Sequence, residues 1–169
     1  MPTPIARTLP FTIAISSAEQ APWTFQSIPG DVKEKCKFWM VLRSRMYLKT
    51  GDYTILGMQD RIAIERKSAA DLWSTLTGSK SNKTRRQVFE RELARLQDME
   101  RAYIVVESDW PSMFDDPPTG ALPKTIYRSY LAYMNRFPGV HWVFCHGRRI
   151  AELTAFRILK RFYEDGIHG

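Results

Sequence analysis

The chain has 169 residues, 44% of them hydrophobic, which is enough for one globular domain whose core needs neither disulfides nor a structural metal. Lysine and arginine outnumber aspartate and glutamate by 25 to 18, so the formal net charge is +7 and the pI is near 9.6. This excess favours an anionic partner, with nucleic acid ahead of a membrane surface.

The first part of the chain is expected to form strands. Three prolines within residues 1–10 predict an extended arm, and residues 11–169 are expected to form a single domain. The strands expected here are residues 11–15, 38–42, 53–56 and 61–66. Residues 31–50 are ambiguous, and we interpret them as a loop followed by a strand. The last two strands form a hairpin around a four-residue turn at 57–60.

Helices alternate with strands in the second part. The expected helices are residues 69–78 after a Ser68 cap, a helix from Thr84, residues 123–136 and residues 148–163. The expected strands are residues 103–106 and 140–145, with a loop over 111–123. Because alternating helices and strands favour parallel pairing, we predict an α/β fold with a mixed central sheet flanked by helices.

The hairpin brings two acids together. With a turn at 57–60, Asp52 falls opposite Glu65, and the two carboxylates share one face. Like charges this close repel, so a cation between them explains the arrangement. Lys67 lies two residues beyond Glu65 and points to the same face. A divalent ion beside a lysine that orients or deprotonates water is a way to hydrolyse a phosphodiester.

These residues also form a longer pattern. Gly51-Asp52, twelve residues, Glu65-Arg66-Lys67, three residues and Asp71 resemble the signature of the XPF-type nuclease domain of XPF, Hef and related structure-specific endonucleases. Further matches are Glu19-Gln20 with Pro22-Trp23 and the strand at 103–107, so the resemblance covers most of the chain.

The resemblance implies a restriction-endonuclease-like fold and a Mg²⁺- or Mn²⁺-dependent endonuclease acting on branched or flapped DNA in repair or recombination. Asp52 and Glu65 would hold the ion, Lys67 would activate water, and Glu19 would assist beside the metal. The C-terminal helix would take part in pairing with a second copy or a partner protein.

One block departs from the family pattern. The family reads Asp-x-Arg-Glu after the first strand, and this chain reads Ser16-Ser17-Ala18-Glu19. The loss of one carboxylate predicts weaker metal binding. It also supports an alternative function, a catalytically weakened or inactive DNA-binding partner or scaffold of the same fold. The retained Asp52, Glu65 and Lys67 favour the nuclease.

Other charged residues have structural and functional interpretations. Arg66 points away from Glu65, so it either braces the site through a buried ion pair or contacts DNA. Asp71 falls in the first turn of a helix, where an acid complements exposed amides. A basic cluster follows that helix and is interpreted as a contact to the DNA backbone. Its members are Lys80, Lys83, Arg85 and Arg86.

Several partners and compartments are not expected. The sequence has no glycine-rich phosphate loop, so no nucleotide cofactor is predicted. No signal sequence or membrane span is visible, and Cys36 and Cys145 show no paired spacing. We expect a cytoplasmic protein, associated with the nucleoid at most, that is not secreted.

Overall fold

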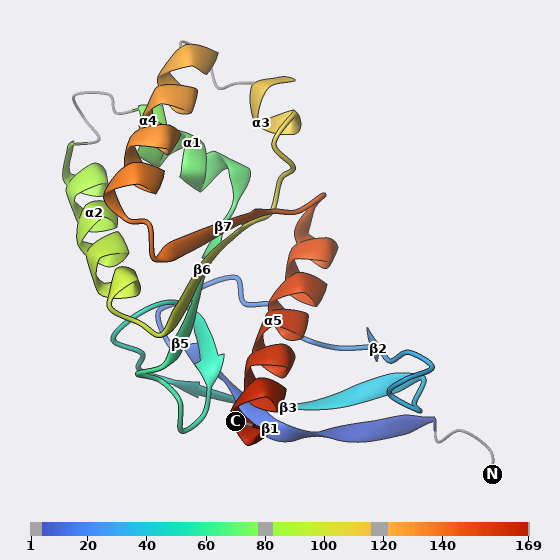
Figure 1. The fold of residues 1–169 in the computed structure, drawn as a ribbon. Coiled ribbons are helices and arrows are strands. Elements are labelled where there is room, and N and C mark those ends of the chain that lie inside the picture. Colours follow the sequence, from blue (N-terminus) through green and yellow to red (C-terminus); the bar gives the residue numbers. More distant parts are fainter. Residues whose placement is uncertain (1–4, 78–82, 116–121, 169) are drawn as a thin grey trace.

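The computed structural model describes residues 5–77, 83–115 and 122–168 (Figure 1). The strands are β1 (Ala6–Ser16), β2 (Ile28–Pro29), β3 (Phe38–Met46), β4 (Tyr53–Ile55), β5 (Ile62–Lys67), β6 (Arg101–Val106) and β7 (Val140–Phe144). The helices are α1 (Ala69–Thr77), α2 (Lys83–Gln97), α3 (Ser112–Asp115), α4 (Pro123–Arg136) and α5 (Arg148–His168). In this part of the chain no helix is long and apolar enough to cross a membrane.

The strands form one mixed sheet in the order β2-β3-β1-β4-β5-β6-β7. β1 runs parallel to β3, β4 runs antiparallel to β1 and β5, and β5, β6 and β7 are parallel to one another. This arrangement confirms the predicted mixed sheet and the parallel pairing in its second half.

Several observed elements differ from the predicted ones. β2 was not predicted, β3 continues to Met46, four residues beyond its expected end, and β6 begins two residues early. β1 begins at Ala6, five residues early, because Ala6 and Arg7 pair with β3; the second half of the expected arm is therefore part of the sheet. α3 lies inside the expected loop, where the Asp109 carboxylate accepts a hydrogen bond from the Ser112 amide at 2.8 Å. α5 continues five residues beyond the expected end.

Helices cover both faces of the sheet (Figure 1). α1, α2 and α4 pack on one face around Ala63, Leu93 and Ile104, and α5 packs on the other around Ile64 and Phe156. Successive residues of a strand point to opposite faces. At the C-terminal end of β5, the side chains of Glu65 and Lys67 therefore point to the α1/α2 face, and that of Arg66 points to the α5 face.

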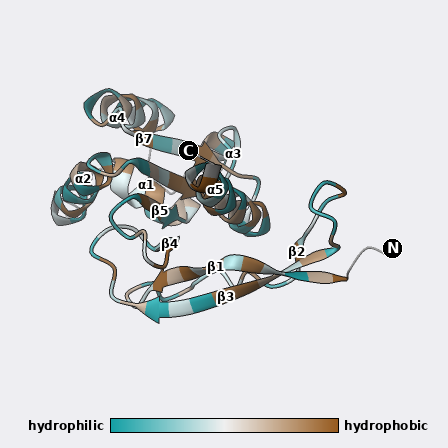
Figure 2. Cartoon of the chain, turned by 60° about the horizontal axis from the view of Figure 1, so that its bottom comes forward, coloured by the Kyte–Doolittle hydropathy of each residue, from teal (hydrophilic) through white to brown (hydrophobic). Residues whose placement is uncertain are grey.

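β1 and β3 lie toward one end of the sheet, away from α1, α2 and α4 (Figure 2). Among the described strands, β2 is the one that borders β3 on its outer side, and it pairs there with Phe38 and Trp39. Phe38, Met40 and Leu42, at alternating positions of β3, are exposed. The buried core has two parts. One lies between α5 and strands that include β1, β4 and β5, and the other lies between α1, α2 and α4 and strands that include β5 and β6.

The β4–β5 hairpin has the predicted register. Tyr53 pairs with Ile64, and the Asp52 amide donates to the Ile64 carbonyl at 2.8 Å, so Asp52 falls opposite Glu65. Gly51, just before this pair, has a φ of +72°, a backbone conformation that residues with a Cβ rarely adopt.

Gly51→Ala is expected to lower the free energy of unfolding by about 2 kcal/mol. The added Cβ would lie 3.1 Å from both the Ala63 Cβ and the Ile64 carbonyl oxygen. Gly57→Ala is the control, since Gly57 also has a positive φ but no atom within 4 Å of its Cβ position. Urea denaturation measures both losses, and equal losses would show that the close approach at Gly51 has no effect.

Candidate active site

Asp52, Glu65 and Lys67 come together on the α1/α2 face of the hairpin. Glu65 is only 4% exposed, and its Oε1 accepts a hydrogen bond from Lys67 Nζ at 2.9 Å. Asp52 Oδ2 accepts a hydrogen bond from the Arg66 amide at 2.9 Å, which ties this carboxylate to the neighbouring strand. The three residues predicted from the sequence therefore form one cluster.

Burial makes the two carboxylates difficult to ionise. It raises the pKa of Asp52 to about 6, and the charges of Glu19 and Glu92 add to the shift. Burial and the repulsion of Asp52 and Glu92 also raise the pKa of Glu65 well above its usual value. Both shifts come first from burial and then from repulsion between carboxylates, and a bound cation would favour the charged form of each group.

Lys67 stays charged in this cluster. Burial opposes its charge, but the carboxylates of Glu65 and Glu92 outweigh burial and raise the pKa of Lys67. Its Nζ also lies 5.1 Å from the centre of the Phe89 ring, on α2. The side chain is thus an ammonium held between a strand and a helix.

Glu92 is a site residue that the sequence did not predict. It lies on α2, and its Oε2 is 3.6 Å from Lys67 Nζ. Its neighbours Phe89 and Leu93 are buried, so Glu92 borders the apolar stripe of the helix. One acid in a helix rich in charged residues gives no distinctive signal, and only the packing of α2 against β5 identifies it.

Arg66 braces the opposite face. It forms a bidentate pair with Glu107 at 2.8 and 2.9 Å. The Trp23 indole N–H and Arg148 also donate to Glu107, at 2.7 and 3.1 Å. Burial opposes ionisation of Glu107, but these donors outweigh it and lower its pKa. Of the two roles considered for Arg66, the structure shows the ion pair.

Glu19 contacts Arg66, on the α5 face, and not the Glu65–Lys67 pair. Its carboxylate lies 3.3 Å from Arg66 Nη1 and accepts a hydrogen bond from the Ala21 amide at 2.7 Å. Its charge still acts on Asp52, as the pKa of that carboxyl shows. Glu19 therefore acts on the site in two ways: through its ion pair with Arg66, and through the electrostatic repulsion between its carboxylate and that of Asp52.

Ser16 lies beside Asp52. Its amide donates to the Asp52 carbonyl at 2.8 Å, and its side chain is buried. The Ser16 hydroxyl accepts a hydrogen bond from the Ala18 amide at 3.2 Å. A serine hydroxyl therefore stands next to the cluster where the family pattern has a carboxylate.

Asp71 has the structural role considered for it. Its amide donates to the Ser68 hydroxyl at 3.1 Å, and that hydroxyl donates to the Asp71 carboxylate at 2.6 Å. This reciprocal arrangement caps the start of α1. Among the described residues, the hydrogen bonds of Asp71 go to α1 and its cap and not to Asp52 or Glu65. Asp71 also lines the cleft between α1 and α2.

The predicted basic cluster is described only in part. Lys80 lies outside the described residues, as does the side chain of Lys83. Arg85 is exposed and reaches the Ser74 hydroxyl at 3.5 Å. Arg86 is engaged within the fold, because it donates to the Tyr133 hydroxyl at 3.1 Å.

The donor set of the cluster fits a hard divalent cation. Mg²⁺ and Mn²⁺ prefer carboxylate oxygens, and Asp52 and Glu65 present two carboxylates on facing positions of a hairpin. Within residues 5–77, 83–115 and 122–168, no three His, Cys, Asp or Glu side chains are grouped to hold a metal. A cation on Asp52 and Glu65 would complete its coordination with water or substrate oxygens.

No family model and no curated protein matches this sequence. Among solved structures, the chain is similar to XPF from Aeropyrum pernix, with a TM-score of 0.58 and 18% sequence identity. The match covers 90% of this chain and 65% of that chain. At this identity the similarity establishes the fold, which is restriction-endonuclease-like as the sequence predicted.

Asp52→Asn is expected to stabilise the protein at neutral pH in EDTA. Because the folded pKa is about 6 and the ordinary value is 3.8, the stabilisation from protonated Asp52 is complete below pH 3.8 and lost as pH rises through 6. The gain at pH 7.5 should be about 3 kcal/mol, with almost none at pH 3.5. An asparagine oxygen still accepts the Arg66 N–H.

Urea denaturation at the two pH values measures this difference. Asp60→Asn, at an exposed turn position, is the control and should change stability at neither pH. A gain of equal size at both pH values would contradict the assigned burial of charge at Asp52.

Proposed function

We propose that the protein is a metal-dependent DNA endonuclease that hydrolyses phosphodiester bonds. The observation that carries this proposal is the convergence of Asp52, Glu65 and Lys67, with Glu65 Oε1 and Lys67 Nζ 2.9 Å apart. The restriction-endonuclease-like fold supports it, and the net charge of +7 suits a polyanionic substrate.

Each residue has a part in the proposed reaction. A Mg²⁺ or Mn²⁺ ion held by Asp52 and Glu65 would lower the pKa of a bound water and stabilise charge on the phosphate. Lys67 is an ammonium, so it orients the attacking water or donates to a phosphate oxygen and does not accept a proton. Glu19 and Arg66 hold the strand ends that present these groups.

The proposed substrate is branched or flapped DNA, in repair or recombination, as the sequence resemblance implies. The proposal includes pairing of two nuclease domains or binding of a partner protein through α5. Ile150 on that helix is exposed, whereas Phe156 is fully buried and belongs to the core. Incubation with flap, fork, nicked and linear DNA in Mg²⁺, Mn²⁺ or EDTA tests both activity and preference.

A second candidate function is DNA binding without catalysis. Ser16 favours it, because a buried hydroxyl beside Asp52 replaces a carboxylate of the family pattern. The candidate predicts structure-selective DNA binding with no cleavage in either metal. It is distinguished from the first by the same incubation.

The variants Asp52→Asn, Glu65→Gln and Lys67→Met are each expected to reduce cleavage at least about a hundredfold while DNA affinity in EDTA stays near that of the native protein. They remove charges that serve metal and water. Arg61→Ala is the control: it breaks an exposed pair with Glu100 and should change cleavage by less than about twofold. Native rates in Asp52→Asn would rule out the proposed site.

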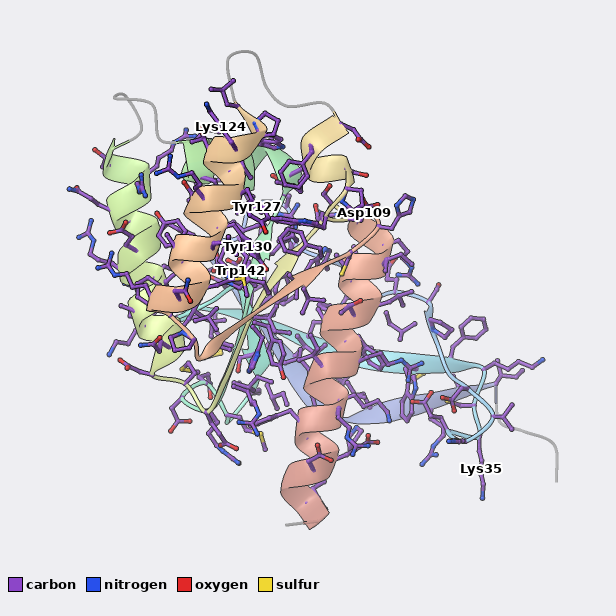
Figure 3. The ribbon with its side chains drawn as sticks, turned by 45° about the horizontal axis from the view of Figure 1, so that its top comes forward. Lys35, Asp109, Lys124, Tyr127, Tyr130 and Trp142 are labelled. Atoms are coloured by element: carbon purple, nitrogen blue, oxygen red, sulfur yellow. The ribbon has the colours of Figure 1, made fainter. Side chains whose placement is uncertain are left out.

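Replacing Lys80, Lys83, Arg85 and Arg86 by alanine is expected to weaken binding to every DNA tested. Each lost phosphate contact should reduce the slope of log affinity against log salt by about one unit. The control replaces three exposed lysines of another segment, Lys33, Lys35 and Lys37. Figure 3 shows Lys35 at one end of the molecule and Lys124, at the start of α4, at the other. An unchanged slope in the first variant would show that its four residues are ordinary surface charges.

Ser16→Asp combined with Ala18→Arg is expected to lower the Mg²⁺ concentration for half-maximal cleavage by about threefold or more, because it adds a carboxylate next to Asp52. The gain should vanish at saturating metal. A titration of initial rate against Mg²⁺ measures it, with Ser17→Asp at the exposed neighbouring position as control. An unaltered requirement in an active enzyme would show that the site lacks no ligand.

A further inference from the structure

A cleft of about 300 Å³ lies between α1 and α2 on the same face as the candidate active site. The α1 wall includes Asp71 and Thr75, and the α2 wall includes Arg85 and Val88. Thr75 is buried, whereas Val88 is 49% exposed, so the cleft has a closed side and an open side. Its volume is at the lower end of small-molecule sites and suits one nucleotide unit, not a duplex.

The cleft ends at the catalytic cluster. Lys67 and Glu92 belong to its lining, and they form the 3.6 Å ion pair that positions the ammonium. A group bound in the cleft would therefore sit next to a phosphate held at Asp52, Glu65 and Lys67. Neighbouring nucleotides of one strand lie close together. The group that would enter the cleft is therefore the nucleotide next to the scissile phosphate.

The charges of the lining select the kind of group. Two cations, Lys67 and Arg85, are balanced by two carboxylates, Asp71 and Glu92. A phosphate gains little from a lining without net charge, whereas a neutral group with both donors and acceptors can be paired by either sign. Hydroxyl groups of Thr75 and Thr84 add further donors and acceptors.

The lining is also partly apolar. Val88 and Phe89 contribute carbon surface to the cleft, and Phe89 lies under the Lys67 ammonium. Pockets that accept an extruded or unpaired base combine apolar walls with polar groups that pair with the base edge. This cleft has both features beside a candidate phosphodiester-hydrolysing cluster.

We infer that the α1/α2 cleft is a subsite for one unpaired nucleobase of the strand that is cut, next to the scissile phosphate. This inference rests on the proposed nuclease function and adds a substrate feature to it: the site takes DNA in which one base beside the cut is free to leave the stack. Branch points and flaps supply such bases, and a continuous duplex supplies them only at the cost of unpairing.

The test combines base removal with filling of the cleft. In flap substrates, each base within three nucleotides of the cut is replaced in turn by an abasic residue. The native protein should lose at least about fivefold in kcat/KM at one position only. Val88→Trp fills the cleft and should lose a similar factor on intact DNA while becoming insensitive to the abasic residue. Ala94→Trp, on the exposed side of α2, is the control and should behave as the native protein.

A binding measurement separates failure of the subsite from failure of the nuclease. The fluorescence of 2-aminopurine, placed at each of the same positions, is recorded with native protein in EDTA. One position should change at least about twofold in the native protein and in Ala94→Trp but not in Val88→Trp. Thr84→Tyr, also in the cleft lining, serves as a second filling variant if Val88→Trp melts early.

The outcomes are distinct. A position-specific fluorescence change without cleavage would support the subsite and overturn the proposed nuclease. Cleavage that no abasic position affects, or a position-specific effect that survives both filling variants, would overturn the subsite and leave the nuclease standing. An absence of any fluorescence change in a DNA-bound protein would also overturn the subsite.

Discussion

The candidate site depends on the pairing of β4 with β5. β4 has three residues, all of them buried, and it is the strand that connects β1 and β3 with β5, β6 and β7. The Thr54 hydroxyl donates to the Ile62 carbonyl at 2.5 Å, which adds a side-chain bond to this short ladder. A slip of one residue would turn Glu65 and Lys67 to the α5 face and separate them from Asp52. One register therefore decides whether the cluster exists.

The alternation of side chains along β5 divides the site into two parts. Glu65 and Lys67 face α2, where the proposed chemistry takes place, and Arg66 faces the paired acids Glu19 and Glu107. Glu107 directly follows β6, and its amide donates to the Lys67 carbonyl at 2.9 Å. The ion pairs on one face thus hold in place the strand that carries the reactive groups on the other.

The electrostatics of the cluster follow from burial in this arrangement. Two carboxylates with raised pKa values and a lysine whose charge is stabilised by its neighbours form a site that is unfavourable as it stands. Such unfavourable charge arrangements occur at functional sites, where a ligand or substrate relieves them. Glu92 increases the repulsion and also holds the ammonium, so α2 contributes to the site as well as to the core.

Local chemistry in the sequence determined much of this protein. The Ser68 cap, the proline that opens α4 and the turn between β4 and β5 all act within a few residues, and for that reason the facing of Asp52 and Glu65 was predictable. The tertiary structure alone decided the partners that arrive from distant elements. Glu92 approaches from α2 and Glu107 from the residue after β6, and the sequence indicated neither contact. The same is true of Ala6 and Arg7, which became strand because β3 supplies their partners. Long-range packing selects these contacts, and the order of strands in the sheet is not encoded in the spacing of any single motif.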